Sequence, residues 1–496
     1  MEPSIVALCL AAAIGIYFYS NPMNHGRWFM IRRFINWFPL GMTYAFLYMG
    51  RYNLVVSKNA LGPLMSNRDF GLIFGAGTVT YAFSFLVNGP LIDKKLGGKK
   101  GIIIAALGAA AANVCLGVLT YLIVVRHLKV KIVLAFSLLY AVNMYFQSYG
   151  AVSIIKVKSY WFHVRERGIF GAIFGTLISV GAYFAFDWGA AIVNMTKANP
   201  VGQLGWFHGL IQRTFATRSG TVDATWAVFF IPAAILTVWA VLDCWLIRDT
   251  PEEANLPSFD TCDASSGQMH VEFTTLDLLK KVFGSSLMLL LAVVELTSGV
   301  LRNGIYQWYT IFTHQVKQPG AEYFTQHWGF LICVFGIIGG FAGGLISDKL
   351  FQSRRGPPVA ILCGLMFLMT IMMAVKLFSS PLAVAWGAVT IAMAVIGVTS
   401  LVSGTAATDF GGRKATGTCS GIIDGCAYLG SGLQSISLGF LTGISWLWWP
   451  IFLMPFTLIG GFIAVKIWHE LPAATRKYID EVELERAPQP EPELVS

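Results

Sequence analysis

Twelve apolar runs, each about twenty residues or longer, follow one another along this 496-residue chain. A helix needs roughly 20 apolar residues to cross a bilayer, and backbone groups in lipid must be hydrogen-bonded within their own segment. Each run therefore predicts a membrane-spanning α-helix. The sequence predicts an all-α polytopic membrane protein with twelve transmembrane helices, at residues 34–56, 70–92, 101–125, 130–155, 168–193, 225–247, 285–309, 328–347, 358–378, 382–406, 415–442 and 446–468.

Charged residues make up only 12% of the chain, and apolar residues make up 55%. A soluble domain is about a quarter charged. This deficit excludes a soluble enzyme, a disordered chain and a nucleic-acid binder, in spite of a net charge of +9.

A further apolar run, residues 4–20, precedes the twelve. Its only early charge is Glu2, and Arg27, Arg32 and Arg33 follow it. This order predicts a retained extra helix with its N-terminus outside, and a cleaved signal peptide is the alternative. We assign residues 1–33 to this N-terminal helix and its basic linker.

The chain divides into two groups of six helices, residues 34–247 and 285–468. The loop between them, 248–284, contains an amphipathic stretch at 276–283, which predicts a short helix at the membrane interface. Residues 469–496 are acidic and rich in proline, as is typical of a disordered tail.

The loop between the second and third helices carries four closely spaced lysines, at 94, 95, 99 and 100. Cytoplasmic loops carry an excess of Lys and Arg. We therefore expect a multi-pass protein of the cell (inner) membrane, with this loop, the loop 248–284 and the C-terminus in the cytoplasm.

The two groups of helices repeat certain residues at nearly constant offsets of 249 to 255 positions. The recurring pairs are Asp93 and Asp348, Gly181 and Gly430, and Arg51 and Arg302. The repeats predict two similar halves related by an axis along the membrane normal. Transporters built in this way bind their substrate near the midplane, between the halves.

Arg51 and Arg302 lie inside predicted spans, where an arginine costs about 2.5–3.5 kcal/mol. A guanidinium stays charged, and its planar fork matches the oxygens of a phosphate. Two such groups facing one another across a cavity would hold a dianion. The alternative is that each arginine is neutralised by an acid of its own helix, which Glu295 could do for Arg302.

Polar side chains accompany the two arginines. Tyr44 and Tyr48 precede Arg51 by seven and three residues, so they share its helix face, although each tyrosine could equally serve packing. The neutral amides that could donate hydrogen bonds to sugar hydroxyls are Gln147, Asn303 and Gln307.

The segment Gly89-Pro-Leu-Ile-Asp93-Lys94-Lys-Leu-Gly-Gly-Lys-Lys100 resembles the loop signature of the major facilitator superfamily. The resemblance implies the major facilitator fold, in which this loop closes the cytoplasmic gate through charge contacts made in one state and broken in another. It also implies the gating residues, which are Gly89, Asp93, Lys94, Arg167 and Asp348.

Within that superfamily, residues 34–468 resemble the organophosphate:phosphate antiporters. The segments that carry the resemblance are Arg51-Tyr-Asn, Tyr81-Ala-Phe-Ser, Phe146-Gln147, Arg165-Glu-Arg-Gly168, Arg248-Asp-Thr-Pro251, Leu301-Arg-Asn-Gly-Ile-Tyr-Gln-Trp308 and Ala427-Tyr-Leu-Gly430. The resemblance implies exchange of a phosphorylated small metabolite for inorganic phosphate by alternating access. It also implies that Tyr81 and Tyr428 join Tyr44 and Tyr48 around the substrate.

The chain also departs from the glycerol-phosphate members of that family. Those members carry charged or ionisable residues at five positions where this chain has other residues, which are Tyr52, Phe85, Ile178, Gln307 and Cys333. Asp424 is an added charge, in a segment similar to the sugar-phosphate exchangers, and we expect it to contact the substrate's polyol part. These departures leave the identity of the organophosphate open.

No phosphate-binding glycine loop and no nucleophile–base pair occurs in the sequence. We therefore expect a transporter and not an enzyme, with no cofactor and no metal, acting as a monomer in the lipid bilayer and binding no nucleic acid. Two alternatives remain, which are a proton-coupled organic-anion symporter that uses Asp424 or Glu295, and a sugar-phosphate sensor that does not transport.

Overall fold

The computed structural model describes residues 2–163, 166–196, 225–258, 261, 284, 286–351 and 354–470. All regular secondary structure in these residues is helical, which confirms the all-α prediction. The expected interfacial helix at 276–283, the tail after 470, and the side chains of Arg167 and Asp348 lie outside what is described.

The first half of the chain forms six spans, and the fifth continues through a π-helical turn, η4, into α7. These elements are α2 (Arg27–Leu61), α3 (Asn67–Leu91), α4 (Gly97–Arg126), α5 (Ile132–Trp161), α6 (Arg167–Tyr183) with η4 (Phe184–Trp188) and α7 (Gly189–Thr196), and α9 (Ala227–Leu246). A second π-helical turn, η2 (Ile92–Leu96), joins α3 to α4, and it carries the predicted gating residue Asp93.

The second half repeats this plan. Its elements are α11 (Ser286–Tyr306) with α12 (Trp308–Val316), the short α13 (Glu322–Gln326), α14 (Trp328–Leu350), α15 (Gly356–Lys376), α16 (Pro381–Ile444) and α17 (Trp448–Lys466). Thr399 and Ala427 of α16 both contact neighbouring residues of α11, although 28 residues separate them along the chain. A straight helix would place them about 42 Å apart, so α16 reverses direction and supplies two spans.

Ten stretches of the described residues are long and apolar enough to cross a membrane, and one of them contains both α3 and α4. The more polar α2 and the second arm of α16 complete twelve spans, with α1 (Glu2–Tyr19) in addition. This arrangement agrees with the predicted twelve helices and the extra N-terminal helix.

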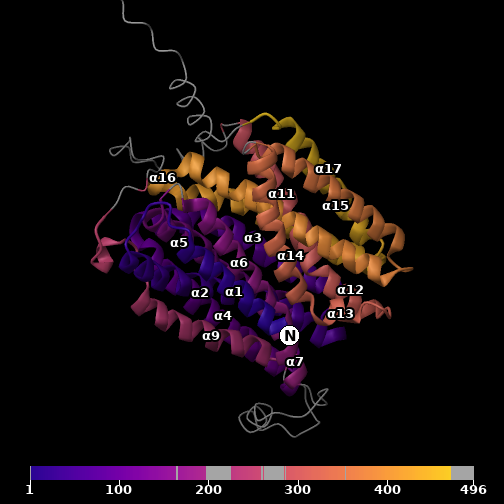
Figure 1. Ribbon diagram of the computed structural model, residues 1–496. Helices are drawn as coiled ribbons and strands as arrows, with labels where there is room; N and C mark the ends of the chain where they lie inside the picture. The colour runs from indigo at the N-terminus through magenta and orange to yellow at the C-terminus, as the bar shows by residue number, and fades with distance from the viewer. Residues whose placement is uncertain are drawn as a thin grey trace, which may run out of the picture.

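The two halves meet along two helix pairs. The helix α3 packs along α16, and α6 packs along α14 (Figure 1). We call the end of the bundle that carries Lys94 and the neighbouring lysines the basic end. The opposite end carries α13, and we call it the α13 end.

Glycines at equivalent positions of the two halves let equivalent helices approach closely. A Cβ atom on Gly181 of α6 would lie 2.9 Å from the backbone oxygen of Ala45 in α2. A Cβ on Gly430 of α16 would clash with the backbone oxygen of Leu296 in α11. Because 181 and 430 are 249 apart, and 45 and 296 are 251 apart, the same contact occurs in both halves.

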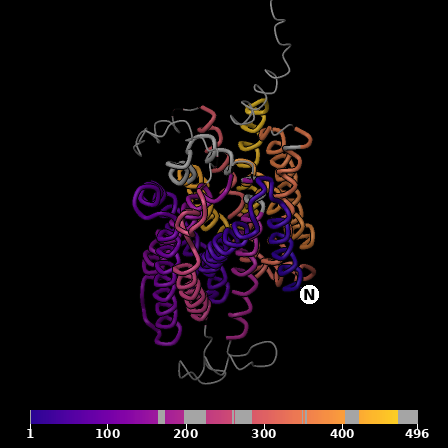
Figure 2. Tube along the Cα trace, turned by 60° about the vertical axis from the view of Figure 1, so that its left-hand side comes forward, coloured from indigo at the N-terminus to yellow at the C-terminus, as the bar shows by residue number. Residues whose placement is uncertain are grey.

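The extra helix α1 lies against α6 of the first half and α14 of the second half. Figure 2 shows its indigo tube beside the orange helices of the second half. Near the basic end, the Tyr17 hydroxyl accepts a hydrogen bond from Arg33 at 3.0 Å. Arg33 in turn donates two hydrogen bonds of 2.9 Å to Glu166, so α1 is anchored to the first half.

Candidate substrate-binding site

Arg51 of α2 is almost completely buried at the contact between the two halves. Its Nε donates a hydrogen bond of 2.9 Å to the side-chain oxygen of Gln147 in α5. A terminal nitrogen donates to the hydroxyl of Tyr428 in α16. The guanidinium also lies 4.9 Å from the ring centre of Tyr48 and 4.7 Å from that of Tyr81. One arginine of the first half therefore reaches an aromatic residue of the second half.

Arg302 occupies the equivalent place in α11, and its guanidinium approaches the same tyrosine. The guanidinium carbon of Arg302 lies 5.6 Å from the ring centre of Tyr428, and that of Arg51 lies 5.3 Å from it. The structure thus brings the two predicted arginines, one from each half, to one aromatic ring.

Both guanidinium groups keep donors that no described residue uses. Nη2 of Arg51 and Nε of Arg302 are buried and have no hydrogen-bond partner within the described part of the chain. None of the ion pairs within 4.0 Å among those residues includes either arginine. The alternative of a direct Arg302–Glu295 pair is therefore not seen, and the site holds two positive charges that an anion can satisfy.

The four tyrosines named in the sequence analysis lie around the arginines. Tyr44 and Tyr48 are neighbours on α2, with ring centres 5.4 Å apart. Tyr81 of α3 lies 4.1 Å, centre to centre, from Tyr428. All four side chains are buried, and the Tyr81 hydroxyl has no partner among the described residues. The rings of Tyr48, Tyr81 and Tyr428 lie within cation–π distance of Arg51, which favours the charged guanidinium at this buried place.

A chain of buried amides holds Arg51 in place. Gln147, which binds Arg51, donates a hydrogen bond of 3.1 Å to the side-chain oxygen of Asn143. Asn113 donates a hydrogen bond of 3.2 Å to the same oxygen. Asn143 donates 3.0 Å to the backbone oxygen of Gly50, next to Arg51. The sequence analysis missed Asn113 and Asn143, although asparagines in the middle of apolar runs are the signal that would have found them.

Asn303 and Gln307 lie beyond the arginines, toward the α13 end. The hydroxyl of Tyr52 in α2 donates 2.7 Å to Asn303, and Asn303 donates to Ser431. Gln307 lies one turn further along, where its side-chain oxygen accepts from Ser435 at 3.5 Å. The Tyr52–Asn303 bond joins the halves and closes the arginine site from the α13 end.

Glu295 and Asp424 lie toward the basic end of the site. Glu295 is 1% exposed, and its Oε1 has no hydrogen-bond partner within the described residues. The carboxylate of Asp424 is close enough to that of Glu295 to repel it. Asp424 is partly exposed.

The profile of the Major Facilitator Superfamily matches residues 40–435 of the chain. The chain belongs to the major facilitator superfamily. Two solved structures are similar to this chain in fold. An inward-facing bacterial homologue of the human lysosomal transporter Spinster is similar with a TM-score of 0.63 and 14% identity, over 92% of this chain and 99% of that one. FucP in the outward conformation is similar with a TM-score of 0.57 and 16% identity, over 87% and 99%.

Curated relatives confirm the resemblance to the organophosphate branch of the superfamily. The membrane sensor protein UhpC of Escherichia coli is 24% identical over 88% of this chain and 91% of its own. The glycerol-3-phosphate transporter of Bacillus subtilis is 23% identical over 80% and 83%. A probable hexose phosphate transport protein of Chlamydia muridarum is 22% identical over 88% and 91%.

The superfamily loop signature lies in η2 and the helix ends beside it. Asp93 is paired with Lys156 of α5, with Nζ 3.3 Å from Oδ1, and both side chains are nearly buried. Gly89 is buried near the end of α3, while Lys94 is exposed. Lys156 was not predicted, because a lysine near the end of a span reads in sequence as an ordinary interfacial charge.

Asp249 closes this region from the loop after α9. Its Oδ1 accepts 2.7 Å from the backbone nitrogen of Lys99, at the start of α4. Burial raises the pKa of Asp249, against the hydrogen bonds from Lys99 and Gly98, which lower it. Asp249 belongs to the segment Arg248-Asp-Thr-Pro251, so this part of the family resemblance corresponds to a contact that fixes the signature loop.

Proposed function

We propose that this protein is a secondary transporter that exchanges a phosphorylated small metabolite, of the sugar phosphate or glycerol phosphate type, for inorganic phosphate. The observation that carries the proposal is the pair Arg51 and Arg302, one from each half, approaching the same Tyr428 ring with donors that are not used. A phosphate dianion offers oxygens to both guanidinium forks, and the organic part of a phosphate ester would extend toward Asp424.

We propose that the exchange proceeds by alternating access, and the contacts between the halves support this proposal. At the α13 end, Asn67 of α3 donates a hydrogen bond of 3.2 Å to Thr442 of α16. Asp187 of η4 accepts a hydrogen bond from a backbone nitrogen of α14. These contacts close the α13 end. Opening that end requires these contacts to break, and we propose that substrate binding between the arginines permits this change.

We propose that the basic end is cytoplasmic, as the lysine cluster predicts, and that the protein resides in the cell (inner) membrane with its C-terminus inside. One chain supplies both arginines, so we propose that the monomer is the functional unit. The chemistry needs no cofactor, since transfer of an anion across the membrane forms and breaks no covalent bond.

The test is counterflow in liposomes that contain the purified protein and a high internal concentration of phosphate. Labelled phosphate outside should accumulate, and external organophosphates from a panel should compete with it. Uptake that does not depend on internal phosphate, but stops when the pH gradient is collapsed, would show that the protein is a proton-coupled symporter and not an exchanger.

A second candidate is a sensor that binds the sugar phosphate without moving it. The observation that favours it is the similarity to the sensor UhpC over 88% of this chain. Saturable binding of the organophosphate without counterflow would select the sensor, whereas counterflow excludes it.

A further inference from the structure

Three side chains from three separate segments converge at the α13 end, away from the arginine site. They are Glu2 of α1, Asp187 of η4 in the first half, and His327, which precedes α14 in the second half. Each offers one oxygen or nitrogen atom, and these atoms all lie within 4.8 Å of one another. In Figure 1 the marked N-terminus lies beside α13 and α7, where this group forms.

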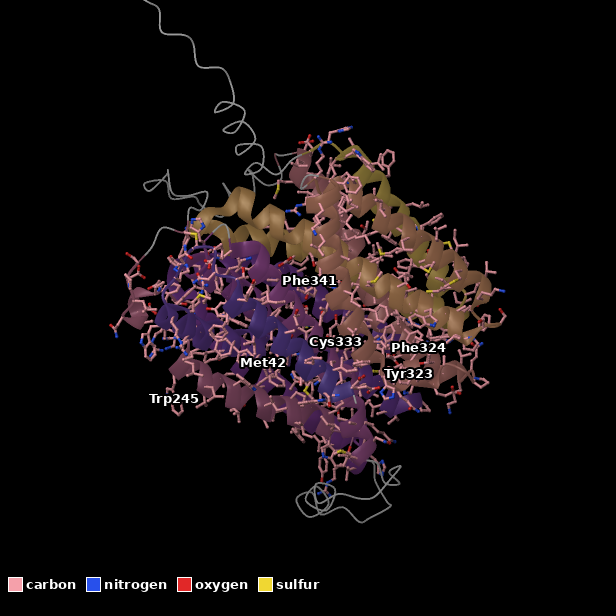
Figure 3. The ribbon with its side chains drawn as sticks, in the orientation of Figure 1. Met42, Trp245, Tyr323, Phe324, Cys333 and Phe341 are labelled. Atoms are coloured by element: carbon pink, nitrogen blue, oxygen red, sulfur yellow. The ribbon has the colours of Figure 1, made fainter. Side chains whose placement is uncertain are left out.

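Glu2 and His327 are already in direct contact. Oε2 of Glu2 lies 2.6 Å from Nδ1 of His327, and the Tyr323 hydroxyl donates 3.2 Å to the other oxygen of Glu2. Tyr323 is labelled in Figure 3 on α13, at the edge of the second half. The side chains of Glu2 and His327 are 22% and 30% exposed, so ions from water can reach them.

Asp187 is held rigidly toward the same point. Its two oxygens accept hydrogen bonds of 2.7 and 2.9 Å from the backbone nitrogens of Gly329 and Phe330, at the start of α14. Each carboxylate oxygen has a second lone pair that these bonds leave available. Two carboxylates lie close together here, so the place between them favours a cation.

We propose that Glu2, Asp187 and His327 form a binding site for a divalent transition-metal ion of the Zn²⁺ type. One imidazole nitrogen and two carboxylate oxygens are a ligand set that zinc accepts, with water as the fourth ligand. Two ligands of one tetrahedral zinc lie about 3.3 Å apart, so the Glu2–His327 contact widens by less than an ångström when the metal replaces the proton between them.

The metal would act as a clamp, because its ligands belong to different moving parts. Asp187 belongs to the first half and His327 to the second, while α1 is fixed to the first half through the bond between Tyr17 and Arg33. An ion bound to all three ligands resists separation of the halves at the α13 end. Bound zinc therefore stabilises the state in which this end is closed.

The first test is a zinc titration of the purified full-length protein against a chromophoric chelator. We expect one equivalent of Zn²⁺ to bind. Each of the variants Glu2→Gln, Asp187→Asn and His327→Gln should weaken the zinc affinity. Loss of a residue that only supports a ligand weakens metal binding by ~10–100-fold, so loss of a direct ligand should cost at least as much. The matched control is Glu322→Gln, since Glu322 is an exposed acid of the neighbouring α13. Thermal unfolding without metal checks that each variant is folded.

Equal zinc affinity of the unaltered protein and the His327→Gln variant overturns the site. This binding measurement does not depend on what the protein transports, so it can fail or succeed independently of the proposed exchange. In liposomes that show counterflow, Zn²⁺ on the α13 side should inhibit the unaltered protein and spare His327→Gln. Equal inhibition of both overturns the clamp.

Discussion

Arg51 of α2 donates a hydrogen bond to the hydroxyl of Tyr428 in α16, and the ring of the same tyrosine lies beside Arg302 of α11. The bond crosses from one half of the molecule to the other. In the exchange mechanism that we propose, the Tyr428 hydroxyl occupies the position that a phosphate oxygen takes when substrate binds. The bound anion then accepts the hydrogen bond from Arg51 in place of Tyr428. Substrate binding would then act directly on a contact between the halves.

Replacing either Arg51 or Arg302 by lysine should reduce phosphate exchange to near background, because lysine keeps the charge but loses the planar fork. Counterflow in liposomes measures the effect, and thermal unfolding checks the fold. Arg27→Lys is the control, since Arg27 is exposed at the start of the same helix as Arg51. If Arg302→Lys keeps most of the exchange activity, the phosphate does not bind in a clamp of two arginines.

Asn143→Ala should weaken phosphate binding although Asn143 does not contact the proposed anion. The change leaves Gln147 and Asn113 without their shared acceptor, so the hydrogen bond that orients Arg51 is no longer supported. We expect KM for phosphate to rise more than kcat falls, and the stability to fall by about 1–3 kcal/mol.

Asn88→Ala is the matched control for Asn143. Asn88 is also fully buried, and it donates a hydrogen bond of 2.7 Å to Ser148, which follows Gln147 in α5 but does not belong to the amide chain that holds Arg51. It should lower stability by a similar amount and leave KM unchanged. If both variants change KM equally, the amide chain stabilises the fold and does not position Arg51.

Asp93→Asn should alter turnover and leave the affinity for phosphate within about threefold. The pair Asp93–Lys156 lies at the basic end, away from the arginines, and its loss shifts the balance between conformations. Lys156→Gln should have the same effect, and the double variant should add little to either change. Loss of binding with normal residual turnover would show that Asp93 belongs to the substrate site.

Glu166 links stability to pH. Burial alone would raise the pKa of this carboxyl, but hydrogen bonds from His25 and Arg33 lower it from 4.5 to about 2. Because the pKa is lower in the folded than in the unfolded protein, the stabilisation is complete above about pH 4.5 and is lost as the pH falls toward 2. It amounts to at most about 3 kcal/mol, since solvent screens part of the interaction.

Glu166→Gln should therefore lower the unfolding temperature at pH 7 and make little difference near pH 2. Unfolding curves recorded across that range measure the effect. Glu252→Gln, at an exposed position in η5 (Glu252–Ala254), is the control, and it should change neither curve. A constant difference between Glu166→Gln and the unaltered protein at all pH values would show that the Arg33–Glu166 pair is not the cause.

The spans and the arginine pair could be predicted because each rests on a strong local rule. Twenty apolar residues in sequence must be helical in lipid, and an arginine inside such a run needs a reason that only a partner or a ligand supplies. The equivalence of Gly181 and Gly430 could also be predicted, and the structure adds why the position needs glycine, which is a close backbone approach in both halves.

Other features could not be predicted, because they depend on which helices become neighbours. Asn143 meets Asn113 across α4 and α5, and Lys156 meets Asp93 across η2 and α5, with no spacing in the sequence that links them. The convergence of Glu2, Asp187 and His327 joins three segments, of which the outer two are 325 positions apart. Each of these polar residues was visible in the sequence, but its partner was not.

Asp424 allows two roles, and one substitution separates them. The carboxylate cannot bind a phosphate directly, since both are anions, so it either offsets the positive charge of the empty site or accepts hydrogen bonds from hydroxyls of a polyol or sugar. The segment Ile422-Ile-Asp424-Gly425 is similar to the sugar-phosphate exchangers, whose substrates carry hydroxyl groups, and this similarity favours the second role. We therefore expect the hydroxyl role.

In that role, Asp424→Asn weakens the binding of the organophosphate by about 1.5–3 kcal/mol, which is the value of a hydrogen bond to a charged group. The binding of inorganic phosphate stays nearly unchanged. Competition between the two anions in counterflow gives both affinities from one preparation. Asp243→Asn is the control, since Asp243 is a buried acid of α9 that accepts 2.7 Å from Thr43, away from the arginines. If the affinities for both anions shift equally, Asp424 acts only through the total charge of the site and does not select the organic part of the substrate.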